Sequence, residues 1–324
     1  MVTLDDVRAA AVRIRGVAVR TPLLDVGPLA LKCENLQPMG AFKVRGACNM
    51  IAQLSPAARS AGVITYSSGN HGQAVALVAK RFGIPAVVVM PETAPPIKVE
   101  GVRRYGAEVI VAGTTTLHRK ARAEQELARR GLTMVPPFDD PWVIAGQGTV
   151  GLEILEQCPN VTTVFVPTGG GGLISGVSAA IKGMRSGVRI VGVEPEGAAK
   201  MSRSREAGHP VTLDRIASIA DGLLAVRPGD LTFEHVQTLV DDVVTVSDEQ
   251  ITAAVRWLFR EASLVAEPSG AAAVAGALEG GSSVVSTTPW SIGPRALRIR
   301  RLGASTRAPR SCSGDTRCGG GTSP

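Results

Sequence analysis

The chain has 324 residues, of which 44% are hydrophobic and 19% charged, and it contains 37 glycines. This composition suits a globular α/β enzyme and argues against a disordered chain or a membrane protein. No apolar run approaches the roughly 20 residues that span a bilayer, and the N-terminus lacks a signal peptide's apolar core. We therefore expect a cytoplasmic protein that does not enter membranes.

The net charge of +7 is unevenly distributed along the chain. Residues 289–324 contain seven arginines and one acid and so carry most of this charge, while the preceding residues are nearly neutral. Only 3% of residues are aromatic, too few for base-stacking platforms, so we expect no nucleic-acid partner. The five cysteines form no CxxC pair, so neither a metal knuckle nor a disulfide framework is predicted.

Strand and helix patterns alternate along most of the chain. Thr3 can cap a helix over residues 5–16, and a strand-like segment (29–36) precedes a loop with Lys43 and a helix. The expected strands that follow are 62–68, 85–91, 107–113, 161–169 and 189–195. The expected helices are 45–54, 69–83, 99–106, 115–131, 146–158 and 172–184. Such alternation predicts parallel sheets covered on both faces.

The C-terminal part differs in character. After Ala277 we find neither helical nor strand periodicity, and residues 289–324 are rich in Arg, Ser, Gly and Pro. We expect this atypical tail to be disordered.

Two motifs contain groups suited to binding or catalysis. Lys43 stands beside Phe42 in the cramped stretch MGAFKVRG (39–46), although a solvated surface lysine fits those residues equally well. In VPTGGGGLISG (166–176), glycines separate a strand from a helix, so converging backbone N–H groups can hold a phosphate. A flexible turn is the alternative for this glycine run.

A third motif, SSGNHGQA (67–74), also joins a strand to a helix. Its amides and the side chains of Ser67, Ser68 and Asn70 can wrap a carboxylate. For His71 we favour a histidine at a helix start without a catalytic duty.

Four ordered motifs together carry a family resemblance. MGAFKVRGA (39–47), SSGNHGQA (67–74), PTGGGGL (167–173) and AEPSGAA (266–272) resemble the fold-type II pyridoxal-phosphate enzymes. The similarity is greatest to the branch of threonine/serine dehydratases, also called threonine ammonia-lyases, and serine racemases. It extends from about residue 3 to about residue 278.

The resemblance implies an α/β fold like that of the tryptophan synthase β subunit. Two domains are expected, each with a mostly parallel sheet flanked by helices. We expect the large domain at residues 1–50 and 142–288 and the small domain at 51–141, with the cofactor in the cleft between them.

The resemblance also implies residue roles. Lys43 would form a Schiff base with pyridoxal 5'-phosphate and later take the substrate's Cα proton, and a crowded site would lower the pKa of its amine. Phe42 would pack beside the cofactor ring, and Asn70 would bond its phenolic oxygen. The residues expected to hold the phosphate are Gly169, Gly170, Gly171, Gly172 and Leu173. The residues expected to bind substrate are Ser67, Ser68, Gly69, Asn70 and His71.

The implied function is pyridoxal-phosphate-dependent deamination of L-threonine, L-serine or both. β-Elimination of water would yield 2-oxobutanoate or pyruvate plus ammonia. The amino acid would be a small-molecule partner, and the chain would form a homodimer or homotetramer.

Two alternatives stay open. Ser68 stands where many threonine deaminases carry alanine, and in the racemase-like branch a serine there exchanges a proton on the cofactor face opposite the lysine. Serine racemisation is therefore an alternative activity. The other alternative is a catalytically impaired cofactor-binding protein, because the C-terminus departs from the family pattern.

The departure at the C-terminus concerns Ser286. This residue, in VVSTTP (284–289), falls where the family has a serine that bonds the pyridine nitrogen. The arginine-rich remainder resembles an out-of-frame reading of a GC-rich gene, and a shift beginning before Ser286 would make its alignment accidental.

A further departure concerns a cation site. The racemase-like branch binds a divalent cation through a Glu, a backbone carbonyl and an Asp, which correspond here to Glu194, Ala198 and Lys200. An ammonium cannot ligate a hard cation, but it can pair with Glu194, so we expect no metal. The alternative is that Lys200 is simply solvated.

Overall fold

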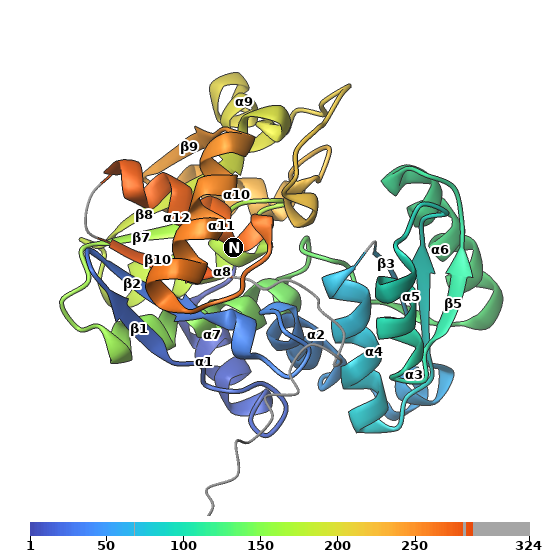
Figure 1. Ribbon diagram of the computed structural model, residues 1–324. Helices are drawn as coiled ribbons and strands as arrows, with labels where there is room; N and C mark the ends of the chain where they lie inside the picture. The colour runs from blue at the N-terminus through green and yellow to red at the C-terminus, as the bar shows by residue number, and fades with distance from the viewer. Residues whose placement is uncertain (68, 281–282, 288–324) are drawn as a thin grey trace, which may run out of the picture. The chain divides into compact units, whose positions relative to one another are not determined.

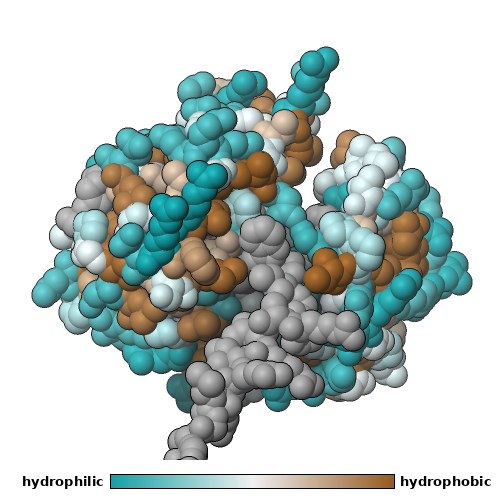
Figure 2. Space-filling model, viewed as in Figure 1, coloured by the Kyte–Doolittle hydropathy of each residue, from teal (hydrophilic) through white to brown (hydrophobic). Residues whose placement is uncertain are grey.

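The computed structural model describes residues 1–67, 69–280 and 283–287, with only the backbone of residues 280 and 283–287. These residues belong to one compact unit. They form two separate β-sheets surrounded by helices (Figure 1). In the described part of the chain, no helix combines the length and apolar character that crossing a membrane requires. The face drawn in Figure 2 mixes hydrophilic and hydrophobic residues over both sheet regions.

The larger sheet has six strands in the order β1-β2-β10-β7-β8-β9. Its strands are β1 (Leu23–Val26), β2 (Leu29–Cys33), β7 (Thr163–Pro167), β8 (Arg189–Pro195), β9 (Asp242–Val246) and β10 (Ser283–Thr287). All neighbouring strands are parallel except β1, which forms an antiparallel hairpin with β2.

The smaller sheet has four parallel strands in the order β5-β4-β3-β6. They are β3 (Val63–Tyr66), β4 (Ala86–Met90), β5 (Glu108–Val111) and β6 (Thr133–Met134). All of them fall within the range predicted for the small domain, whose boundaries stay a prediction.

Helices connect the strands and cover both sheets. Their bounds are α1 (Leu4–Arg13), α2 (Lys43–Ile51), α3 (Pro56–Ala61), α4 (Asn70–Phe82), α5 (Pro96–Arg103), α6 (Thr116–Arg130), α7 (Pro141–Gln157), α8 (Gly172–Met184), α9 (Lys200–Ala207), α10 (Asp230–Leu239), α11 (Asp248–Ala262) and α12 (Pro268–Gly280). Three short 3₁₀ helices are η1 (Glu34–Leu36), η2 (Glu196–Ala198) and η3 (Asp221–Leu223). Thr3 caps α1 as predicted, in a capping box with Asp6.

Both faces of each sheet are buried, which explains the continuous apolar strands. In β4, Val88 and Met90 pack in the cluster that contains α4, whereas Val87 and Val89 pack in the cluster that contains α6. In β7, Phe165 and its neighbour Val166 likewise join different clusters. Alternate side chains of a strand point to opposite faces, so each strand contributes to two cores. The predicted architecture of parallel sheets between helices is confirmed.

Two sequence predictions were wrong near strand ends. The strand expected over residues 29–36 ends at Cys33, because η1 begins at Glu34. After Ala277 no periodic structure was expected, yet α12 continues to Gly280 and β10 follows it. β10 pairs with both β2 and β7, so its backbone hydrogen bonds come from partners distant in sequence that local periodicity does not reveal.

A buried ion-pair cluster joins α2 to the larger sheet. Arg45 in α2 holds Glu34 with Nε to Oε2 at 2.8 Å and Nη2 to Oε1 at 2.7 Å. Its Nη1 also donates to Oε1 of Glu153 in α7 at 2.7 Å, and Oε2 of Glu153 accepts from Lys32 in β2. Arg45, Glu34 and Lys32 are fully buried. The cluster therefore fixes α2, which begins at Lys43.

Replacing Arg45 by Met should lower the free energy of unfolding by about 3–5 kcal/mol, because buried Glu34 would lose its charged partner. Urea unfolding of the cofactor-free protein measures this loss. Arg8→Met is the control, since Arg8 makes an exposed pair with Asp5 that contributes little. Equal unfolding midpoints for the two variants would show that the buried pair does not hold α2.

Candidate active site

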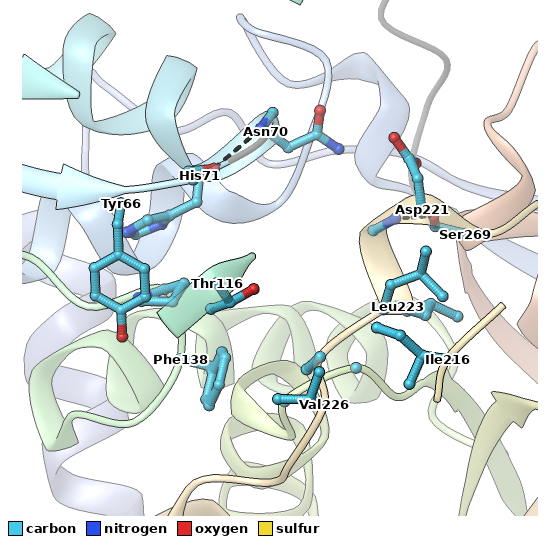
Figure 3. Close-up of a pocket in the computed structure, with 18 of the residues that line it drawn as sticks. Tyr66, Asn70, His71, Thr116, Phe138, Ile216, Asp221, Leu223, Val226 and Ser269 are labelled. Atoms are coloured by element: carbon cyan, nitrogen blue, oxygen red, sulfur yellow. Dashed lines mark hydrogen bonds between the residues drawn. The ribbon is translucent and has the colours of Figure 1, made fainter. Parts of the chain in front are cut away.

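A cavity of about 1050 Å³ lies between the two sheets. Residues at the carboxyl ends of three parallel strands line it, namely Tyr66 of β3, Pro91 after β4 and Pro167 of β7. Figure 3 shows Tyr66 and Phe138 on one side and Leu223 with Ser269 on the other. Open α/β sheets bind ligands at the carboxyl ends of their strands, so this cavity is the candidate active site.

Lys43 lines this cavity from the first turn of α2. The sequence predicted it in a loop; it is instead the first helical residue. Its Nζ donates to the carbonyl of Pro137 at 2.7 Å and lies 5.1 Å from the Phe42 ring centroid. Burial lowers the pKa of Lys43 to about 8, and the negative charge of Glu267 opposes that shift. With a pKa of about 8, roughly a tenth of the amine is unprotonated at pH 7.

Asn70 begins α4 and lies across the cavity from η3 (Figure 3). Its Nδ2 donates to Oε1 of Glu267 at 2.9 Å. Glu267 precedes α12 and is 6% exposed, and its charge also acts on Lys43. The motif AEPSGAA (266–272) contains this glutamate, but no role was predicted for it from the sequence. The signal available was an acid directly before a proline at a helix start.

His71 is 3% exposed and follows Asn70. Its Nε2 lies 3.0 Å from the Val135 carbonyl, which can only accept, so Nε2 carries the hydrogen. Burial and, secondarily, the charge of Lys43 lower the pKa of His71 to about 3, which keeps the ring neutral. Nδ1 finds no partner among the described residues. It is left as a hydrogen-bond acceptor beside the cavity.

The other residues of this loop are only partly described. Ser67 accepts a hydrogen bond from the Gly69 amide at 3.1 Å, and both residues line the cavity. Ser68 lies outside the described residues. Ser286 pairs with Lys32 in the β10–β2 ladder, but its side chain is likewise not described. The roles predicted for Ser68 and Ser286 stay predictions.

The glycine loop connects β7 to α8, as predicted, and lines the cavity. Gly171 has a φ of +99°, which favours glycine. A Cβ on Gly170 would lie 2.4 Å from the Phe138 ring, so no larger residue fits there without a shift. Within the described chain, the backbone N–H groups of residues 169–173 donate to no protein acceptor. Free first-turn amides and the helix dipole make this loop suited to an anion.

Residues that sequence reasoning missed support the glycine loop. Thr232 Oγ1 donates to the Gly170 carbonyl at 2.6 Å. Asp139, which also lines the cavity, accepts from the amides of Leu231 and Thr232 at 3.1 and 3.2 Å. No local pattern could reveal these contacts, because they join segments about 60 to 90 residues apart.

A second missed feature is an ion pair across the cavity. Lys98 of α5 pairs with Asp221 of η3, and both line the cavity. Lys98 also lies beside Gly69, 3.4 Å from the position of a Cβ there. The pair thus connects the helix after β4 with the loop that precedes α10.

Lys200 lies below the cavity wall and is fully buried. Its Nζ is 3.1 Å from Oε2 of Glu194 and donates to the Ala198 carbonyl at 3.0 Å. The alternative of a solvated lysine is therefore wrong. Among the described residues, no group of three His, Cys, Asp or Glu could hold a metal ion. The expected absence of a metal stays a prediction.

Comparison with known proteins shows similarity over most of the chain. The family described as "Pyridoxal-phosphate dependent enzyme" matches residues 14–288. The L-threonine ammonia-lyase of Thermotoga maritima is 45% identical over 286 residues, which are 86% of this chain and 71% of that protein. The structure of maize serine racemase aligns with a TM-score of 0.84 at 40% identity, covering 88% of this chain and 92% of that chain.

Length distinguishes the chain from another relative. The biosynthetic L-threonine dehydratase of Escherichia coli is 45% identical over 248 residues, which are 76% of this chain. The matched region is 48% of that protein, so this chain spans about half its length. The similar proteins thus include one named as an ammonia-lyase, one named as a dehydratase and one named as a racemase.

Replacing Glu267 by Gln should move the pKa of Lys43 further below 8, because the negative charge that raises it is removed. The rate at which cofactor-free protein takes up pyridoxal 5'-phosphate should then reach its half-maximum at a lower pH than in the wild type. Glu261→Gln, which changes an exposed glutamate at the end of α11, should leave that pH unchanged. A shift to higher pH in Glu267→Gln would contradict this electrostatic relation.

Proposed function

The chain belongs to the family of pyridoxal-phosphate-dependent enzymes, and on that premise we propose that it deaminates L-threonine and L-serine. The observation that carries the proposal is one cavity that contains two suitable groups. They are the Lys43 amine, whose pKa is lowered, and the glycine loop of residues 169–173, whose backbone N–H groups have no acceptor among the described residues. The products would be 2-oxobutanoate from threonine and pyruvate from serine, each with ammonia. The name of the Thermotoga maritima relative supports this choice of reaction.

The residues present fit the cofactor. A phosphate needs several N–H donors without protein acceptors, and residues 169–173 supply them at the start of α8. An aldehyde needs an unprotonated amine, and the lowered pKa of Lys43 provides one. We propose that Gly169, Gly170, Gly171, Gly172 and Leu173 hold the phosphate, with Phe42 beside the ring. Asn70 would offer the ring oxygen its second Nδ2 hydrogen, since the first goes to Glu267.

The loop between β3 and α4 suits a substrate carboxylate. Asn70 starts α4, so the positive end of the helix dipole lies at this loop. We propose that Ser67, Ser68, Gly69, Asn70 and His71 contact the amino acid. His71 lines the cavity with a neutral ring, so it can contact the side chain of threonine or serine without adding a charge.

Lys43 would act as the base in this reaction. Bound pyridoxal phosphate supplies an aldehyde for amine attachment and a ring that draws electrons from the substrate's Cα. The Lys43 amine would take the Cα proton and return it to the departing β-hydroxyl, which would leave as water. The enamine released then reacts with water to give the 2-oxo acid and ammonia. A pKa of about 8 leaves Lys43 able to accept this proton and to lose it again near neutral pH.

Wild-type protein with pyridoxal phosphate should release ammonia from L-threonine and L-serine, and Lys43→Ala should lower kcat at least about a hundredfold. The thermal midpoint of the cofactor-free protein should not change, because Lys43 lies at a helix start beside a cavity. Lys80→Ala, at an exposed position of α4, controls for the loss of a lysine. Retained activity in Lys43→Ala would contradict the assignment. Cofactor uptake by the wild type without ammonia release would favour the impaired cofactor-binding protein.

Serine racemisation is a second candidate, favoured by Ser68 and by the likeness to maize serine racemase. Ser68→Ala should reduce the formation of D-serine more than the deamination of L-threonine, because the second proton donor would be lost. Chiral chromatography of D-serine and an ammonia assay measure the two activities, with Ser60→Ala in α3 as a control. Equal loss of both would instead give Ser68 a role in substrate binding or in the departure of the hydroxyl.

We also propose a cytoplasmic location and a homodimer or homotetramer. Support comes from the family resemblance in the motifs of residues 39–47 and 167–173. Cell fractionation and light scattering of the purified protein measure these properties directly.

A further inference from the structure

A buried ammonium group lies beneath the glycine loop, surrounded by oxygen atoms. Lys200 Nζ donates to the carbonyls of Thr168 at 2.9 Å, Ala198 at 3.0 Å and Leu223 at 3.2 Å. The carboxylate of Glu194 lies at 3.1 Å. Lys200, Glu194 and Ala198 are fully buried, and Thr168 is 1% exposed. Water is therefore excluded from most of this site.

Burial lowers the pKa of Lys200, whereas the carboxylate of Glu194 and the ring of acceptors around Nζ favour its charged form. An ammonium has three hydrogens, and each of the three carbonyls takes one. A neutral amine would have only two hydrogens, and its lone pair would face a remaining oxygen. Glu194 also accepts from the amides of Met201 and Ser202, so both of its carboxyl oxygens are bound at the start of α9.

The ammonium joins two segments that line the cavity. Thr168 follows the last residue of β7 and directly precedes Gly169, so its carbonyl lies at the start of the glycine loop. Leu223 is the last residue of η3, two residues after Asp221, and it lines the cavity. Charge-assisted bonds to both segments therefore hold the phosphate-binding loop and the opposite wall at a set separation.

We propose that the Lys200 ammonium is a covalently attached structural cation that positions the glycine loop for cofactor binding. It takes the place that a dissolved cation would need to fill between these carbonyls and Glu194. Oxygens at 2.9 to 3.2 Å are too distant for Mg²⁺ or Ca²⁺, which bind oxygen at about 2.0–2.6 Å. A site vacated by the lysine would therefore take a large monovalent cation such as K⁺ or NH₄⁺.

The test is Lys200→Ala, with cofactor affinity and the thermal midpoint of the cofactor-free protein as readouts. In tetramethylammonium chloride, whose cation is too large for the site, the dissociation constant for pyridoxal phosphate should rise at least about tenfold. KCl or NH₄Cl at the same ionic strength should restore most of the affinity and raise the thermal midpoint, whereas MgCl₂ should not. Neither readout requires turnover, so both are independent of the proposed deamination.

Two controls separate this effect from general salt sensitivity. Lys182→Ala removes another lysine that pairs with an acid, Asp241. Lys182 lies in α8, the helix that follows the glycine loop. It should show no preference for K⁺ over tetramethylammonium. The wild type should keep its affinity within about twofold in EDTA or added Mg²⁺, because its cation is covalently attached.

Lys200→Ala that keeps wild-type affinity in every salt, or that loses affinity without rescue by K⁺ or NH₄⁺, would overturn the proposal. If the variant does not fold, the double variant Lys200→Met with Glu194→Gln provides the test, because it fills the site without burying an unpaired charge. The double variant should fold, and its affinity for the cofactor should be the same in every salt. That affinity should be at least about tenfold weaker than in the wild type. Wild-type affinity in the double variant would show that no cation is needed there.

Discussion

The buried ion pair between Arg45 and Glu34 is the constraint on which the candidate site depends. Lys43 and Arg45 both lie in the first turn of α2. The ion pair that fixes the Arg45 side chain therefore also fixes the backbone from which the Lys43 side chain extends. Glu153 extends the same cluster to α7, the helix at the junction between the segments of the two sheets. Stability and the placement of the Lys43 amine are therefore properties of one cluster.

The cavity is organised by opposing electrostatic effects. Burial favours the neutral amine of Lys43, whereas Glu267 favours the ammonium, and the resulting pKa of about 8 lies between the two tendencies. His71 adds no charge, because its ring stays neutral. On the opposite side the glycine loop offers N–H donors without a fixed positive side chain. The site thus brings an amine of lowered pKa and a set of backbone N–H donors into one cavity.

Local features were predictable from sequence, whereas long-range partners were not. The cap at Thr3 and the glycines between β7 and α8 depend on neighbouring residues, and both predictions were confirmed. The pairing of Asn70 with Glu267 spans 197 residues, and neither motif signals it. The pairing of Lys200 with Glu194 was expected from the sequence, but its three carbonyl acceptors were not, because they come from the folded backbone.

The pair of Lys98 and Asp221 has a consequence for what can enter the cavity. Free amino acids are zwitterions with one ammonium and one carboxylate, which are also the charges of this pair. A zwitterion can exchange partners with Lys98 and Asp221 while each charge keeps an opposite neighbour and the local net charge stays constant. An amine or a carboxylic acid alone would leave one member unmatched, so we expect this wall to disfavour ligands with a single charge.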